Sequence, residues 1–117
     1  MQDLTPLCQL ADLPEGQARG FLPHPQARRQ VIVMRRGNGV VAYWDSCPHY
    51  AGGTPMAWRK DAYLNGDATH FACHAHGALF DIDSGECVIG PCLGRRLTRV
   101  PVQLCNGAVL IPARLAR

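Results

Sequence analysis

Short runs of apolar and β-branched residues, separated by glycine, proline and asparagine, recur along the whole chain. The clearest is QVIVMR at 30–35, which is followed after Gly37-Asn38-Gly39 by VVAYW at 40–44, a pattern typical of a β-hairpin. Asn106-Gly107 predicts another hairpin, because this dipeptide readily adopts the backbone angles of a tight turn. In all, the pattern predicts eight short strands, at 5–10, 30–35, 40–44, 70–73, 79–82, 86–89, 97–105 and 108–112.

The segments between these strands are typical of turns and loops. Pro23 and Pro25 predict a loop over 20–27. The stretch 55–67 is less regular, and its fragments fit either short strands or one helical turn. We expect the tail 113–117 to be loosely held. Since no segment is a convincing amphipathic helix, the predicted fold class is all-β, an antiparallel β sandwich or small barrel.

The length of 117 residues is close to the common domain size, so we expect 1–117 to form a single domain. A composition of 47% apolar and 18% charged residues is ordinary for a soluble globular protein. No apolar run approaches the roughly 20 residues of a membrane helix, and the first residues do not resemble a secretory signal. We therefore expect a cytoplasmic protein with no membrane association.

The net charge of +3 is too small to indicate nucleic-acid binding by itself. Much of the positive charge comes from arginines that are spread over the chain, mostly in pairs: Arg28, Arg29, Arg35, Arg36, Arg95, Arg96 and Arg99. We interpret most of them as solvated strand faces and turns. The alternative is a docking surface for an acidic partner.

Six cysteines in a chain expected to be cytoplasmic indicate metal binding or packing rather than a disulfide framework. Three lie in strand patterns and are expected in the core: Cys8, Cys87 and Cys105. Cys92 follows a Gly-Pro pair, and we interpret it as a small buried residue rather than a further ligand. The remaining two, Cys47 and Cys73, each stand close to a histidine.

The stretches CPHYAGG (47–53) and CHAHGALFD (73–81) place these cysteine–histidine pairs in loops that follow strands. Cys47 and His49 form Cys-x-His, and Cys73 and His76 form Cys-x-x-His after a spacer of 23 residues, positions 50–72. Thiolates and imidazoles together suit zinc or an iron–sulfur centre. A structural zinc would fit two cysteines and two histidines by ligand count and tetrahedral geometry, so ligand type alone leaves both possibilities open.

The two stretches resemble the ligand loops of Rieske [2Fe–2S] domains. The family pattern is Cys-x-His-x-Gly, then Cys-x-x-His-Gly-x-x-Phe-Asp-x-x-x-Gly, then a Gly-Pro loop. Asp81, Gly85 and Gly90-Pro91 stand at the matching positions. The resemblance implies an all-β Rieske sandwich with a smaller cluster-binding subdomain, whose loops span about 45–94, and one [2Fe–2S] cluster per chain.

Carried over position by position, the resemblance assigns Cys47 and Cys73 to one iron, and His49 and His76 to the other. Each loop would thus give one ligand to each iron, which accounts for the mixed pairs. Two features depart from the pattern: Ala51 replaces the usual glycine, and the spacer between the loops is longer than is common. Neither departure involves a ligand.

The resemblance also bears on the reduction potential. Respiratory Rieske proteins have a loop disulfide and two hydroxyl donors to the cluster sulfurs, whereas here Ala78 and Phe80 occupy the donor positions and no loop disulfide can form. Fewer donors stabilise the reduced cluster less. We therefore expect a potential toward the low end of the Rieske range, as in the ferredoxins of multicomponent oxygenases.

The function implied is a soluble one-electron carrier that passes electrons from a reductase to an oxygenase or other terminal enzyme, with its docking face around His49, His76 and Pro91. We expect no catalysis by the chain alone, because His24, His70 and His74 suggest no facial iron triad and no nucleotide-binding fingerprint is present. Two alternatives remain: a tightly bound subunit of a nitrite-reductase-like or oxygenase complex, and a zinc-stabilised binding module.

Overall fold

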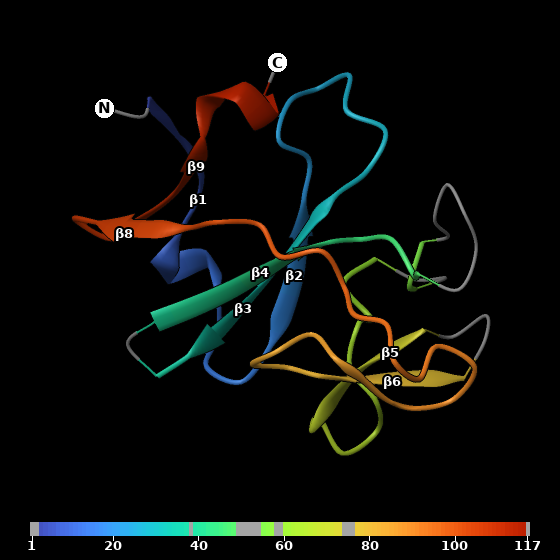
Figure 1. Cartoon of the computed structure of the whole chain (residues 1–117). Helices are drawn as coiled ribbons and strands as arrows, with labels where there is room; N and C mark the ends of the chain where they lie inside the picture. The colour runs from blue at the N-terminus through green and yellow to red at the C-terminus, as the bar shows by residue number, and fades with distance from the viewer. Residues whose placement is uncertain (1–2, 38, 49–54, 58–59, 74–76, 117) are drawn as a thin grey trace.

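The computed structural model describes residues 3–37, 39–48, 55–57, 60–73 and 77–116, which fold into three small antiparallel sheets (Figure 1). The strand orders are β1-β9-β8, β2-β3-β4 and β5-β6-β7. In chain order the strands are β1 (Leu4–Gln9), β2 (Ala18–Phe21), β3 (Val31–Arg36), β4 (Gly39–Trp44), β5 (His70–Cys73), β6 (Ala78–Asp81), β7 (Cys87–Ile89), β8 (Gln103–Cys105) and β9 (Ala108–Pro112). The predicted all-β class is therefore confirmed.

Two short 3-10 helices complete the elements, η1 (Leu10–Asp12) and η2 (Ala113–Ala116). The tail predicted to be loose thus forms η2, which packs against β1 and β9. Within the described part of the chain, no helix is long and apolar enough to cross a membrane.

The middle sheet, β2-β3-β4, is buried on both faces and separates two apolar cores. Because side chains alternate along a strand, Val31 and Val33 of β3 join one core with β1 and β9, while Ile32 and Met34 join the other. All four side chains are at most 1% exposed. A continuous apolar run is what such a doubly covered strand requires.

The second core joins the middle sheet to β5-β6-β7. Tyr43 of β4 donates its hydroxyl hydrogen to the Ile82 carbonyl at 2.8 Å and meets Phe71 edge to face, with ring centroids 5.6 Å apart. Gly85 packs directly on the Tyr43 ring, since a Cβ at this position would lie only 2.7 Å from it. These contacts hold the β5-β6-β7 sheet against the middle sheet.

Both predicted hairpins are confirmed. Asn106 and Gly107 have φ angles of 51° and 81°, as a tight two-residue turn requires, and Cys105 pairs with Ala108 across it. In the other hairpin, Arg36 pairs with Gly39, while Asn38 lies outside the described residues. The strand at 70–73 and that at 108–112 match their predicted bounds.

The sequence analysis missed one strand and predicted another too long. The predicted loop over 20–27 overlaps β2, a four-residue strand that sequence reasoning missed because ARGF contains no β-branched residue. Of the predicted strand over 97–105, only β8 forms. The first half of this stretch crosses from one sheet to another, because the Leu97 N–H donates to the Gly85 carbonyl and the Val100 N–H donates to the Ala42 carbonyl. Pro101 then lacks the N–H that a continuous ladder would need.

The irregular stretch 55–67 is held to β2 by a polar contact. Asp61, with a φ of 65°, accepts the Gly20 N–H at 2.7 Å, and Lys60 donates to the Gly20 carbonyl at 2.6 Å. Gly20 has no room for a Cβ, which would overlap the side chains of Gln30 and Tyr63. Farther along the stretch, Leu64 forms an isolated bridge with Phe71 of β5, so this part is extended rather than helical.

Replacing Asp61 with asparagine should lower the free energy of unfolding at pH 7 by about 1 kcal/mol, because the acceptor remains but its charge is lost. Burial raises the pKa of Asp61, but the Gly20 N–H and Lys60 lower it more, so the net pKa is below its usual value. Stability from this carboxylate is therefore present above about pH 4 and lost as pH falls through the folded pKa. Urea unfolding of the protein and of Asp61→Asn at pH 7 and pH 3 checks this. If their difference in free energy of unfolding were the same at both pH values, the prediction would be contradicted.

Candidate metal centre

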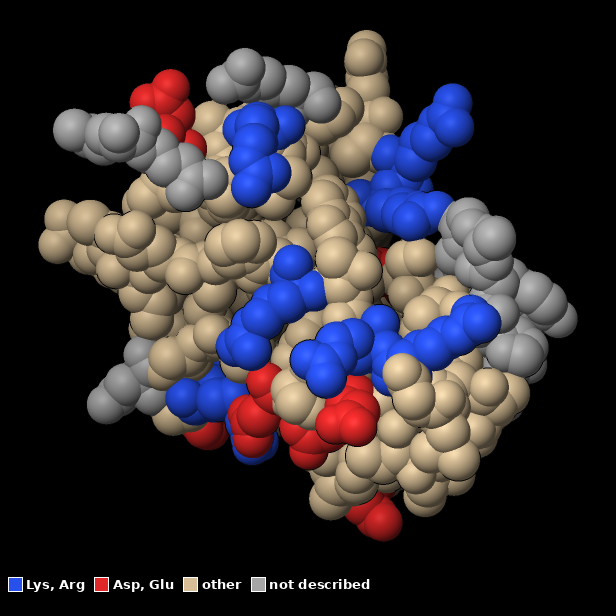
Figure 2. All heavy atoms as spheres, viewed as in Figure 1, with Lys and Arg blue, Asp and Glu red and all other residues tan. Residues whose placement is uncertain are grey.

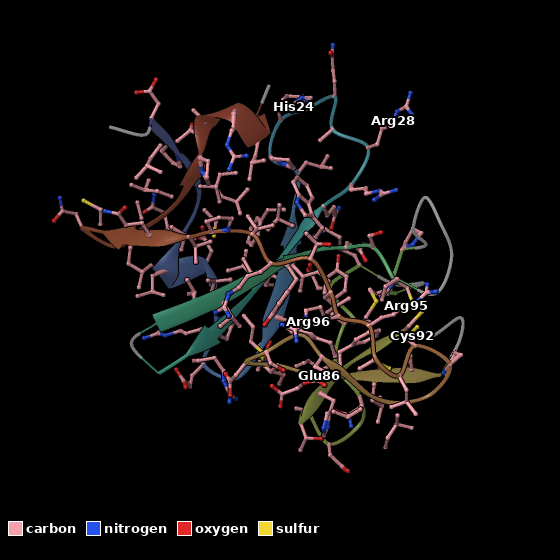
Figure 3. The ribbon with its side chains drawn as sticks, viewed as in Figure 1. His24, Arg28, Glu86, Cys92, Arg95 and Arg96 are labelled. Carbon is pink, nitrogen blue, oxygen red and sulfur yellow. The ribbon has the colours of Figure 1, made fainter. Side chains whose placement is uncertain are left out.

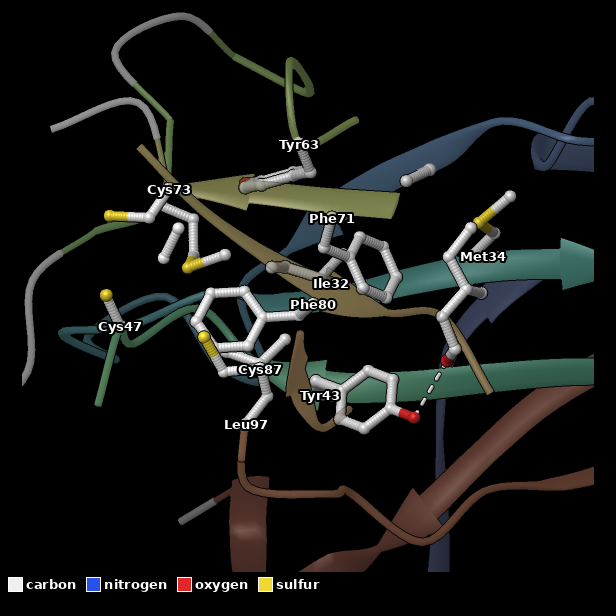
Figure 4. Close-up of a cluster of buried hydrophobic side chains, with 14 of the residues drawn as sticks. Ile32, Met34, Tyr43, Cys47, Tyr63, Phe71, Cys73, Phe80, Cys87 and Leu97 are labelled. Carbon is white, nitrogen blue, oxygen red and sulfur yellow. Dashed lines mark hydrogen bonds between the residues drawn. The ribbon is translucent and has the colours of Figure 1, made fainter. Parts of the chain in front are cut away.

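The structure brings two of the four predicted ligands, Cys47 and Cys73, into one buried group. Both are 0% exposed and both belong to the core formed with β5-β6-β7. Figure 4 shows their sulfurs at the same end of this core, away from Met34 and Tyr43. The other two predicted ligands, His49 and His76, lie outside the described residues.

Cys73 is positioned by the end of β5 and the start of β6. It is the last residue of β5 and pairs with Ala78 at the start of β6. Gly77 closes the connection by donating its N–H to the Cys73 carbonyl at 2.8 Å, with a φ of 71° that favours glycine. The glycine after the second histidine of the motif is therefore required by the return of the chain into β6.

The predicted Gly-Pro loop lies against Cys73 and its cross-strand partner, Ala78. Gly90 has a φ of 105°, and a Cβ there would stand 2.8 Å from the Cα of Ala78, so only glycine allows so close an approach. Because Ala78 is the cross-strand partner of Cys73, the Gly90-Pro91 loop packs beside the second thiol. Pro91 itself is exposed.

Cys92 is a third thiol at the site. It is 1% exposed, and its sulfur lies 3.9 Å from the Cys47 sulfur, within hydrogen-bonding distance for sulfur. Burial raises the pKa of the Cys92 thiol, its contact with Cys47 lowers it, and the nearby Cys87 and Cys73 thiols raise it further. Cys92 is thus buried as predicted, but it also contacts a predicted ligand, which the sequence did not reveal.

The surroundings of these thiols are apolar. Ala78, Phe80 and Leu97 belong to the same core and are at most 1% exposed. Among the described residues, none that is polar or charged is fully buried, so the donor atoms brought together here are sulfurs. Two buried thiols that lie in one apolar core suit a thiolate-ligated iron–sulfur centre.

A family model for the Rieske [2Fe-2S] domain matches residues 3–105 of the chain. The chain belongs to the Rieske [2Fe–2S] domain family. Its cofactor is therefore one [2Fe–2S] cluster per chain, and the residues present fit that group, since the thiols of Cys47 and Cys73 converge where the family motif places ligands. The expectation of this family and of its [2Fe–2S] cofactor is confirmed.

Solved structures share this Rieske fold. A ferredoxin from Sphingomonas yanoikuyae B1 matches with a TM-score of 0.70 and 24% identity, over 94% of this chain and 98% of that one. A chain from the complex of reduced oxygenase and oxidized ferredoxin in carbazole 1,9a-dioxygenase matches with a TM-score of 0.70 and 21% identity, over 97% and 95%. A chain described as a candidate NADPH nitrite reductase small subunit matches with a TM-score of 0.64 and 21% identity, over 93% and 97%. Comparison with curated proteins gave no match.

Two arginines from distant parts of this Rieske domain hold the segment that carries Cys47. Arg29 donates to the Ser46 hydroxyl at 3.1 Å, and Arg95 donates to the Pro48 carbonyl at 2.7 Å. At the start of the same segment, the Asp45 carboxylate accepts the Met56 N–H at 2.7 Å. Sequence reasoning missed these contacts, because residues 17 and 47 positions from their partners leave no motif.

The two side chains that stand in place of the hydroxyl donors of respiratory Rieske proteins line the core of the site. Ala78 and Phe80 are both 0% exposed and belong to the same core as Cys47 and Cys73. The low reduction potential inferred from them stays a prediction. If Cys47 binds iron as a thiolate, the Cys92 S–H is the donor of their contact and adds one weaker donor that the inference did not count.

Replacing Cys92 with alanine should lower the midpoint potential of the Rieske cluster. A buried S–H donor stabilises the more negative, reduced state. If that preference is about 1 kcal/mol, the midpoint falls by about 40 mV, because 1.4 kcal/mol corresponds to about 59 mV for one electron. Redox titration of the visible spectrum measures it. Cys8→Ala, a buried thiol in the other core, is the control, and equal midpoints in all three proteins would show that Cys92 donates nothing.

Proposed function

We propose that the chain is a one-electron carrier that receives electrons from a reductase and passes them to an oxygenase or another terminal enzyme, without catalysing a reaction alone. Cys47 and Cys73 would hold one iron of the cluster, and His49 and His76 the other. When bound, the cluster supplies a site that gains and loses a single electron. Its midpoint should lie toward the low end of the range from roughly −150 to +300 mV.

The observation that carries this proposal is the meeting of Cys47 and Cys73 in one buried apolar core, within a chain whose family match runs from 3 to 105. The extent of the structural match adds support. The chain covers almost the whole length of the Sphingomonas ferredoxin, so the likeness is to an entire small ferredoxin.

The chain's own residues would perform three tasks. The two thiols bind the iron, and the apolar side chains of Phe80 and Leu97 exclude water from it. Gly90 brings the Gly-Pro loop close enough to form a wall of the site. An apolar setting that keeps water away from the iron would limit solvent reorganisation between redox states, which favours rapid electron transfer.

Visible absorption and EPR spectra of freshly purified protein, oxidised and then reduced with dithionite, test the proposal. The expected result is a brown protein whose reduced form gives a rhombic signal with an average g below 2. Titration of that signal then gives the midpoint. A colourless protein that contains stoichiometric zinc after anaerobic purification would overturn the proposal.

A second candidate is a small subunit that stays bound to a larger oxidoreductase. It is favoured by the match to the candidate nitrite reductase small subunit, of which this chain covers 97%. Affinity purification from the native cell, followed by gel filtration, separates the two. Constant elution with a larger iron or flavin protein supports the bound subunit, and elution at the size of the chain supports the mobile carrier.

A further inference from the structure

Several arginines of this protein take no part in its ion pairs. All nine carboxylate side chains lie among the described residues, and the ion pairs they form use Arg19, Arg35, Arg36 and Lys60. Within the described part of the chain, six arginines have no Asp or Glu carboxylate within 4.0 Å: Arg28, Arg29, Arg95, Arg96, Arg99 and Arg114. The first five precede β3 or follow β7.

Four of these arginines, Arg28, Arg29, Arg95 and Arg96, form what we call the arginine band. All four are exposed. Figure 2 shows basic side chains gathered on one face, with the acidic ones mostly at its lower edge, and Figure 3 shows Arg95 beside Cys92. Arg99 is left out of the band because its guanidinium lies 5.9 Å from the centre of the Tyr43 ring, as in a cation–π contact.

Two hydrogen bonds fix the band to the metal centre. Arg29 and Arg95 donate to Ser46 and Pro48, the residues on either side of Cys47. Nearby negative charge is limited: the Asp45 carboxylate is partly buried and accepts a backbone N–H, and Glu86 faces Arg96 across an isolated bridge. Arg29 and Arg95 therefore place positive charge directly beside the segment that carries Cys47.

Exposed apolar side chains adjoin the band. Leu93 is 65% exposed and Ile89 is 56% exposed, and they flank the Gly90-Pro91 loop. Cys92, next to Leu93, points inward to within 3.9 Å of the Cys47 sulfur. An apolar patch beside exposed charges, directly over the electron-carrying site, has the composition of a protein interface.

We propose that the arginine band and Leu93 form the docking surface for a redox partner whose own docking face is acidic. The inference rests on the proposed electron-carrier function and names the partner's chemistry. Complementary charge raises the rate of encounter and orients the partner. Because Arg29 and Arg95 of the band hold the residues on either side of Cys47, a partner drawn to them would arrive over the cluster.

Stopped-flow oxidation of the dithionite-reduced holoprotein tests this inference with two inorganic oxidants of opposite charge, hexacyanoferrate(III) and hexaamminecobalt(III). The rate with the anion should fall several-fold as ionic strength rises from about 10 to 500 mM, since the Debye length shrinks from about 30 Å to below 8 Å. The rate with the cation should rise or stay unchanged. Poly-L-glutamate, a model of an acidic protein face, should slow oxidation by hexacyanoferrate(III), and poly-L-lysine should not.

Three single variants locate the effect. Arg28→Glu and Arg96→Glu alter the band at positions that form no hydrogen bond to the described residues of the metal centre, and each should lower the low-salt rate with hexacyanoferrate(III) about threefold or more. Arg114→Glu makes the same change of charge in η2, at the end of the chain beside β1 and β9, and should change the rate far less. Visible spectra confirm that each variant is loaded.

The outcomes separate this inference from the function on which it rests. A protein with no cluster refutes the proposed function itself. A loaded protein that exchanges electrons but responds equally to Arg114→Glu and Arg96→Glu refutes the docking surface alone, because the effect is then one of net charge. A dimer in gel filtration that dissociates only in Arg96→Glu would also overturn the inference, since the band would then bind a second copy.

Discussion

Cys73→Ala is expected to give a folded protein that holds no [2Fe–2S] cluster, whereas Cys87→Ala keeps it. Both cysteines are buried, at 0% and 3% exposure, in the same core, so the two changes remove the same atoms from similar surroundings. Only Cys73 belongs to the ligand motif and ends the strand beside the Gly-Pro loop. Iron content and visible absorption of the purified variants should therefore fall to background in Cys73→Ala alone.

The Cys87 variant is a matched control because its sulfur has another role in the structure. It donates to the Ile89 carbonyl at 3.3 Å, and losing this bond should cost stability without removing iron. Far-UV circular dichroism of both variants separates misfolding from loss of the ligand. If Cys73→Ala retained full iron, or if both variants lost it equally, the assignment of Cys73 as a ligand would fail.

Gly90→Ala should destabilise the protein by about 3 kcal/mol and speed the loss of the cluster on heating. A φ of 105° costs an alanine about 1–2 kcal/mol, and its Cβ would press on the Ala78 Cα from 2.8 Å. Since that neighbour is backbone, either the Gly-Pro loop or β6 has to move, which adds the cost of overpacking. The urea midpoint and the decay of visible absorption at elevated temperature measure both effects.

Gly94→Ala separates the two causes. Gly94 lies in the same loop and also has a positive φ, of 88°, but a Cβ there would meet nothing within 4 Å. It should therefore lose only about 1–2 kcal/mol and keep its cluster as long as the natural protein does. Equal effects of the two substitutions would show that the contact of Gly90 with Ala78 does not hold the loop in place.

The strands were predictable where the local pattern and the tertiary setting agree. VIVM in β3 is continuously apolar because it is covered on both faces, and Asn106-Gly107 encodes its turn through the conformations these residues tolerate. The pattern failed for Cys105, expected in the core but exposed. It lies on the outer face of the edge strand β8, whose inner face presents the half-buried Leu104, and alternation alone did not show which face was inner.

By itself, the sequence determined the Rieske family, the cluster and the all-β class, because ligand spacing, glycine positions and apolar alternation are local properties of a chain. Only the tertiary structure brought the Cys92 sulfur to Cys47, pressed Gly90 onto Ala78, and placed Arg29 and Arg95 on either side of one ligand segment. These contacts join residues 12 to 47 positions apart. Such pairs meet through the packing of whole sheets and loops, which short-range sequence patterns do not specify.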